Sequence, residues 1–189
     1  MLLPGFDGAR REASPVPVAA RFAPIQRSLG GEPVGARSPS DDPGAIRAAA
    51  VAALARRDHL AAELLEILQS RGFDPAATAA VIAELASERL LDDARVVERF
   101  VAFRAQRGQG PLRIAMDLRS RGASPALIEA AIAAGPDWGA VAREVRRRKF
   151  GAAPPESWPE RARQSRFLQY RGFSSDHIRA ATGAEFELD

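Results

Sequence analysis

The chain has 189 residues, 46% of them hydrophobic and 27% charged, with a formal net charge of +3 at pH 7. The absence of cysteine excludes disulfides and a thiolate zinc site, and two widely separated histidines disfavour any other protein-built transition-metal site. No apolar stretch approaches the length of a membrane span, so we expect a soluble, cytoplasmic protein that needs no cofactor.

The first 43 residues are rich in proline and glycine and show no sustained periodicity. This composition predicts a disordered or loosely attached extension, residues 1–43. Helix formation is predicted to begin at Asp42-Pro43, where a capping carboxylate precedes a proline suited to a first helical turn. A first unit, residues 44–90, is expected to contain helices over residues 43–57, 59–70 and 75–89.

Two further units are predicted to follow the first. The second, residues 91–136, is expected to hold helices that start near residues 91, 111 and 125. The third, residues 137–183, is expected to hold helices over residues 137–150, 159–170 and 175–182, followed by an acidic tail at residues 184–189. Because the chain is rich in alanine and lacks alternating β-branched runs, the predicted fold is all-α.

The pair Arg-Gly recurs at residues 71–72, 121–122 and 171–172, each time three residues after a leucine. A period of 50 residues held twice indicates an internal repeat, and hence an array of three tandem three-helix repeats. Each glycine stands where a helix would end in the left-handed conformation. In such an ending Phe73 would fold back on Leu68, and Ala123 would make a weaker version of the same contact.

Positive charge is concentrated in the third unit, where residues 138–179 carry ten basic and four acidic residues. The run Arg146-Arg147-Arg148-Lys149 is typical of a solvated helix face, but a second cluster at residues 161–179 allows a basic patch. Trp138, Trp158 and Tyr170 lie among these residues. They could stack on bases, or they could anchor the core and loops.

Two other motifs have a structural and a functional interpretation. Asp92-Asp93 could ligate Mg²⁺, but at the start of a helix such acids more often cap free N–H groups. Gly108-Gln109-Gly110-Pro111 is favoured as a helix-to-helix turn, although Arg107 and Arg113 flank it and its N–H groups could receive an anion. No catalytic constellation is present, so we expect no enzyme.

Taken together, these motifs resemble the RecX family of bacterial recombination regulators. The resemblance covers about residues 45–182 and rests on the runs Leu68 to Phe73, Leu90 to Arg95, Phe100-Val101, Gly108 to Ile114, Leu118 to Gly122, Arg148 to Gly151 and Arg166 to Phe173. It implies an elongated, curved array of three-helix repeats. The N-terminal extension and Ala123, where the other two copies have Phe, depart from the pattern.

The resemblance also implies a function. A RecX protein would bind the RecA nucleoprotein filament along its groove, with single-stranded DNA inside it, and would inhibit recombination, ATP hydrolysis and coprotease activity as a non-catalytic monomer. The alternative is an independent helical DNA-binding protein or transcription regulator. The residues expected to contact filament or nucleic acid are Arg107, Arg113, Arg143, Arg146, Arg147, Arg148, Lys149, Arg161, Arg163, Arg166 and Arg171.

Overall fold

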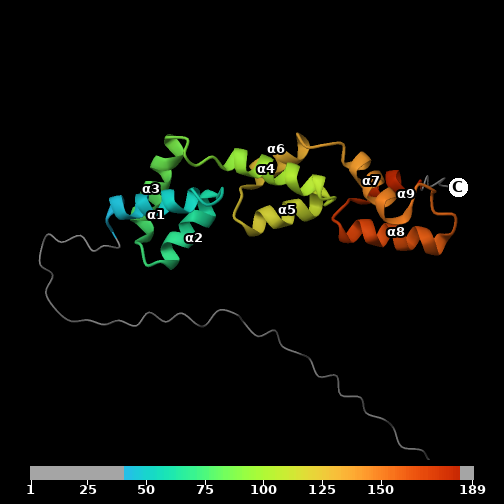
Figure 1. Ribbon diagram of the computed structural model, residues 1–189, viewed down its shortest axis with the longest axis horizontal. Coiled ribbons are helices and arrows are strands. Elements are labelled where there is room, and N and C mark those ends of the chain that lie inside the picture. Colours follow the sequence, from blue (N-terminus) through green and yellow to red (C-terminus); the bar gives the residue numbers. More distant parts are fainter. Residues whose placement is uncertain (1–40, 184–189) are drawn as a thin grey trace, which may run out of the picture. The chain divides into compact units, whose positions relative to one another are not determined.

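The computed structural model describes residues 41–183, which form nine α-helices and no strand (Figure 1). The predicted all-α fold is therefore confirmed for this part of the chain. The predicted tail and almost all of the predicted N-terminal extension lie outside the described residues. The helices are α1 (Pro43–Leu54), α2 (Ala61–Ser70), α3 (Pro75–Ser87), α4 (Asp93–Gln106), α5 (Pro111–Ser120), α6 (Pro125–Ala133), α7 (Trp138–Phe150), α8 (Trp158–Tyr170) and α9 (Ser175–Thr182).

Consecutive helices pack in groups of three, which we call repeat 1 (α1–α3), repeat 2 (α4–α6) and repeat 3 (α7–α9). Each repeat has its own cluster of buried apolar side chains. Leu60, at the start of α2, is fully buried in the cluster of repeat 2 rather than in that of its own repeat. Apolar packing therefore continues from repeat 1 into repeat 2.

The second helix of each repeat ends in the same way. The N–H groups of Phe73, Ala123 and Phe173 donate to the carbonyl oxygens of Leu68, Leu118 and Leu168 at 3.3, 3.1 and 3.2 Å. The intervening glycines have φ of +91°, +81° and +87°, a region that disfavours side chains. The predicted Schellman endings are confirmed, and they turn each second helix directly into the third.

The third helices begin with side-chain caps. Asp74, Ser124 and Ser174 accept hydrogen bonds from the N–H groups of Ala77, Leu127 and His177 at 2.8, 3.3 and 3.4 Å. Helix α2 differs, because it begins at Ala61 rather than at the predicted residue 59. Its first N–H groups are bound by carboxylates: Leu60 N–H donates to Glu63 at 3.1 Å, and Ala61 N–H donates to Asp93 of repeat 2 at 2.8 Å.

Adjacent repeats meet where the end of one second helix lies against the start of another. At the junction of repeats 1 and 2, a Cβ added to Gly122 would lie 2.5 Å from the Cβ of Ala62. At the junction of repeats 2 and 3, a Cβ on Gly172 would lie 2.6 Å from the backbone N of Arg113. Gly122 and Gly172 are 50 residues apart, so a similar close approach is built twice, and only a residue without Cβ permits it.

The junction of repeats 2 and 3 is also joined by main-chain hydrogen bonds. Gly110 N–H donates to the carbonyl oxygen of Arg171 at 2.7 Å, and Leu112 N–H donates to that of Gly172 at 3.0 Å. N–H groups at the start of α5 are thus satisfied by the carbonyls of the two residues that follow α8.

Candidate functional site

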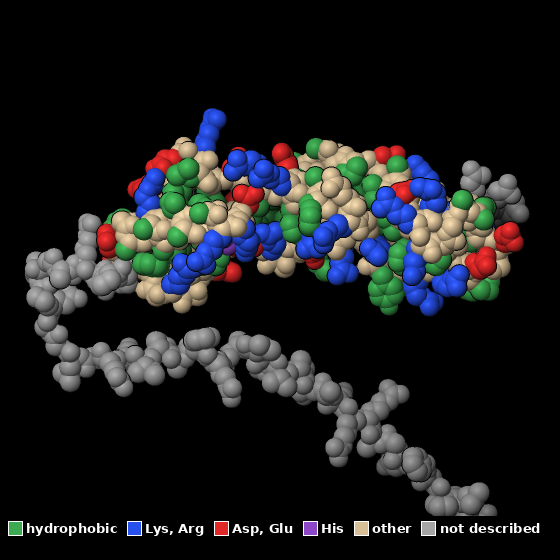
Figure 2. All heavy atoms as spheres, in the orientation of Figure 1, with side chains coloured by type: hydrophobic (Ala, Val, Ile, Leu, Met, Phe, Trp, Pro, Cys, Tyr) green, Lys and Arg blue, Asp and Glu red, His purple; other side chains and the backbone are tan. Residues whose placement is uncertain are grey.

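The basic residues predicted to form one patch lie in several different environments. Arg143 pairs with Asp137, Arg147 pairs with Glu144, and the guanidinium of Arg163 lies over the ring of Phe150. Arg161 is half-buried. In Figure 2 Lys and Arg side chains occur over all three repeats, so charge by itself does not single out a site.

Arg146 does not belong to the exposed patch, and the expectation that it contacts a partner is wrong. Its side chain is only 7% exposed. The guanidinium donates to the carbonyl oxygens of Gly151, Ala152 and Ala153 at 3.3, 3.0 and 2.8 Å, and to Gln164 at 3.2 Å. Arg146 thus holds the loop between α7 and α8 in place through the several N–H donors of its guanidinium, which is a structural role.

Four of the predicted residues converge on one cavity of about 280 Å³ where repeats 2 and 3 meet. They come from the ends of three helices, α4, α7 and α8, and we call them the junction cations: Arg107, Arg148, Lys149 and Arg171. Gln106, Gly108, Val145 and Phe167 complete the wall. An apolar wall beside several cations lowers the local dielectric and strengthens attraction for an anion.

The junction cations have few negative partners. Arg148 donates to Glu144 at 2.7 Å, a carboxylate that it shares with Arg147. Arg107 and Arg171 lie over the rings of Phe103 and Phe167, at 4.6 and 5.2 Å from their centres. Within residues 41–183, Arg107, Lys149 and Arg171 form no ion pair, so the cavity keeps an excess of positive charge.

The predicted turn at Gly108 to Pro111 connects α4 to α5, but its N–H groups are not open to an anion. Gly108 and Gln109 donate to carbonyls at the end of α4, while Gly110 donates to Arg171 across the junction. The hypothesis that this backbone receives an anionic partner is therefore wrong. Of the two arginines that flank the turn, Arg107 lines the cavity, and Arg113 donates to the carbonyl oxygen of Tyr170 at 3.4 Å.

The three aromatic residues noted in the sequence separate into two kinds. Trp138 is buried, and its Nε1 donates to the carbonyl oxygen of Ile132 at 3.1 Å, so it is a core anchor. Trp158 and Tyr170 are 77% and 76% exposed. Tyr170 and Arg166 line a second hollow, of about 410 Å³, on α8. An exposed ring beside an arginine is a surface on which a base can stack.

The acidic pair at the start of α4 is structural. Asp92 caps its own helix by accepting from Arg95 N–H at 3.0 Å, whereas Asp93 caps α2 across the junction of repeats 1 and 2. No group of His, Asp and Glu side chains in residues 41–183 is arranged to hold a metal ion. Over the same range, no helix is both long and apolar enough to cross a membrane.

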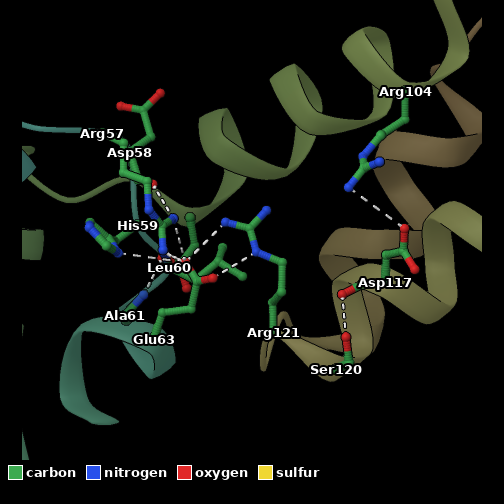
Figure 3. A network of polar contacts seen from close by, with 11 residues as sticks. Arg57, Asp58, His59, Leu60, Ala61, Glu63, Arg104, Asp117, Ser120 and Arg121 are labelled. Carbon is green, nitrogen blue, oxygen red and sulfur yellow. Dashed lines mark hydrogen bonds and ion pairs between the residues drawn. The ribbon is translucent and has the colours of Figure 1, made fainter. Parts of the chain in front are cut away.

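The junction of repeats 1 and 2 contains a charge network that sequence reasoning missed (Figure 3). Arg121, at the end of α5, donates from Nε and Nη2 to the two carboxylate oxygens of Glu63 at 2.7 and 3.0 Å. The Glu63 side chain is only 15% exposed. This bidentate pair joins residues 58 positions apart, and the spacing of charges along the chain gives no signal for it.

The environment of this pair shifts the pKa values of two groups. Partial burial raises the pKa of Glu63, but hydrogen bonds from Arg121 and Leu60 N–H and the positive charge nearby outweigh burial and leave it below its ordinary value. Burial and the charge of Arg57 lower the pKa of His59, whose Nδ1 lies 3.8 Å from Glu63. At neutral pH the network is therefore a carboxylate with arginine partners beside a neutral imidazole.

We expect Glu63→Gln to reduce the free energy of unfolding by about 2 kcal/mol at pH 7, since it removes a largely buried charged pair. The loss should shrink with acidification. A carboxyl whose folded-state pKa is lowered contributes stability above its unfolded pKa, near 4.5, and loses it as pH falls through the folded value.

Urea unfolding of both proteins between pH 3 and pH 7 measures this difference. Glu66→Gln, an exposed change in the same helix, is the matched control and should leave stability nearly unchanged. A Glu63→Gln deficit that is constant over the whole pH range would contradict the lowered pKa.

The fold and site define a class of protein: an all-α array of three-helix repeats in which basic side chains converge where two repeats meet. Comparison with known proteins agrees. A family model described as the second three-helix domain of RecX matches residues 92–132, and the model of the third three-helix domain matches residues 140–182.

Known relatives extend this similarity over most of the chain. Regulatory protein RecX of Halorhodospira halophila is 48% identical over 146 residues, which covers 77% of this chain and 91% of that protein. Regulatory protein RecX of Pseudomonas savastanoi is 44% identical over 139 residues, covering 73% and 90%. The chain therefore belongs to the RecX family.

Solved structures support the fold. The crystal structure of RecX from Lactobacillus salivarius matches with a TM-score of 0.67 at 19% identity, over 75% of this chain and 95% of that one. A second RecX crystal structure matches with a TM-score of 0.61 at 17% identity, over 75% and 74%. At such low identity the likeness concerns the arrangement of the helices alone.

Proposed function

We propose that this protein is a non-catalytic modulator of homologous recombination and the SOS response that binds the RecA nucleoprotein filament in the cytoplasm. It acts as a monomer, lies along the filament groove, and inhibits the recombinase, ATPase and coprotease activities of RecA. The observation that carries the proposal is membership of the RecX family, through a relative named a regulatory protein and 48% identical over nine-tenths of its length.

The physical properties of the array support this function. Three repeats offer a long surface built of similar units, which suits a partner that is itself a repeating filament. The junction cations and Tyr170 lie on repeats 2 and 3, where a polyanion would find both charge and an exposed ring. Binding through such a surface can block filament sites without a catalytic group.

Co-sedimentation with preassembled RecA filaments tests the proposal directly. We expect the parent protein to pellet with filaments at concentrations at which it does not pellet with bare single-stranded DNA, and to inhibit RecA-driven ATP hydrolysis. Equal binding to filaments and bare DNA, with no effect on ATP hydrolysis, would instead support an independent DNA-binding protein.

Charge reversal tests which surface binds. Arg148→Glu combined with Lys149→Glu should weaken inhibition about tenfold or more, since two exposed junction cations become anions. Arg56→Glu combined with Arg95→Glu makes the same charge change on exposed residues of repeats 1 and 2 and should have a much smaller effect. Equal potency of the two double variants, both folded by circular dichroism, would contradict this docking surface.

A further inference from the structure

The two junctions between repeats use equivalent positions but differ in charge. Arg121 and Arg171 occupy equivalent positions, 50 residues apart, at the ends of α5 and α8. The same spacing relates Glu63, near the start of α2, to Arg113, near the start of α5. Where repeats 1 and 2 meet, the arginine binds a carboxylate; where repeats 2 and 3 meet, the equivalent position supplies a second arginine.

The arginines at the second junction lack a counter-ion within residues 41–183. Arg171 contacts the ring of Phe167 and the carbonyl oxygen of Arg107, the latter at 3.5 Å. Arg113 donates to the carbonyl oxygen of Tyr170 at 3.4 Å. Both are long hydrogen bonds to neutral groups, whereas Arg121 makes two short bonds to a carboxylate.

The helix ends at the cavity do not supply the missing negative charge. Each helix C-terminus carries roughly half a negative charge, so α4, α7 and α8 together balance between one and two cations. Glu144 is the one carboxylate bonded to a junction cation in the described residues, and it is shared with Arg147 outside the cavity. Four junction cations therefore leave room for an external anion.

We propose that a phosphate group binds in the cavity of the junction cations and completes the junction of repeats 2 and 3, as the Glu63 carboxylate completes that of repeats 1 and 2. A cavity of about 280 Å³ is at the small end of ligand sites and has room for a phosphate group. Several guanidinium forks match the tetrahedral oxygens of phosphate better than they match one carboxylate.

The source of the phosphate is the backbone of single-stranded DNA, and this point alone rests on the proposed function. Tyr170 is exposed and lines the separate hollow on α8, which offers an aromatic ring on which a base of the same strand can stack. Binding would then add a charged contact to the main-chain hydrogen bonds that already join repeats 2 and 3.

Arg113→Glu is the decisive variant, because it places a carboxylate at the position equivalent to Glu63, which at the first junction binds Arg121, the equivalent of Arg171. Thermal unfolding would be followed with inorganic phosphate or with chloride at matched ionic strength. We expect phosphate to raise the melting temperature of the parent, and Arg113→Glu to raise it without phosphate while losing most of the response. Arg119→Glu, an exposed change in the same helix, should keep the parent's response.

Binding of a fluorescent oligothymidylate tests the source of the phosphate. We expect Arg113→Glu and Arg171→Gln each to weaken it about tenfold or more, with Arg119→Glu close to the parent. Arg171→Gln keeps the proposal testable if the glutamate variant does not fold. A different outcome would overturn the phosphate site: polyglutamate raises the melting temperature of the parent, whereas phosphate and oligonucleotide do not. The cavity would then be assigned to an acidic protein segment.

These measurements use the isolated protein and separate the two proposals. Unchanged phosphate and oligonucleotide responses in both variants would overturn the site while leaving filament binding as it stands. A phosphate response that behaves as expected, together with failure to pellet with RecA filaments, would keep the site and remove the proposed function.

Discussion

Arg146→Glu should unfold repeat 3, with a loss of about 3 to 5 kcal/mol or more in the free energy of unfolding. The substitution replaces a buried donor fork with a carboxylate facing the carbonyl oxygens of Gly151, Ala152 and Ala153. Every favourable contact becomes a repulsive one, and a buried charge is left without a partner.

Arg147→Glu is the matched control for this prediction. It is the next residue of the same helix and makes the same charge change, but its side chain is 62% exposed. Reversal there costs a surface ion pair, which is worth at most about 1 kcal/mol. Circular dichroism during urea unfolding measures both, and limited proteolysis locates the damage. Equal stability of the two variants would refute the buried role of Arg146.

The second large effect is expected at the repeat junctions, where Gly172→Ala should cost about 3 kcal/mol and Gly72→Ala about 1 kcal/mol. Both glycines have positive φ, so each variant pays the conformational strain of a Cβ in that region. At Gly172 the new Cβ would also lie 2.6 Å from the backbone N of Arg113, whereas at Gly72 it meets no atom within 4 Å. Overpacking adds about 1 to 3 kcal/mol.

The difference between the two glycine variants isolates docking from helix capping. Denaturant unfolding gives both free energies, and small-angle X-ray scattering reports whether repeat 3 has separated from repeat 2. If Gly172→Ala and Gly72→Ala had the same free energy of unfolding, repeats 2 and 3 could move apart without loss of stability. The close approach at Gly172 would then not hold the array together.

The sequence allowed the helices to be predicted because their signals are local. Prolines at first turns, side-chain caps and glycines at helix ends act within about six residues, so the ends of most helices agree with the structure. The first helix ends at Leu54 rather than at the predicted residue 57, and the start of α2, two residues later than predicted, depends on Asp93 of another repeat. No local rule describes that contact.

The candidate site was only partly predictable. The junction cations were all among the predicted basic residues, but grouping them required the ends of α4, α7 and α8 to meet in space. Arg146 was misassigned because charge was given more weight than spacing. It follows Trp138 and Ala142 at intervals of four residues, and all three lie on the buried face of α7.

The free end of the first repeat bears on how such arrays change in length. Gly72 ends α2 with the same backbone geometry that α5 and α8 use to dock, yet in the described residues nothing lies close to it. Each repeat carries the glycine that ends its second helix and allows close docking. Duplicating the DNA that encodes one 50-residue repeat would therefore add both a new repeat and the means to dock it. Arrays of this kind can therefore grow during evolution, or be extended by a protein engineer, one ready-made module at a time.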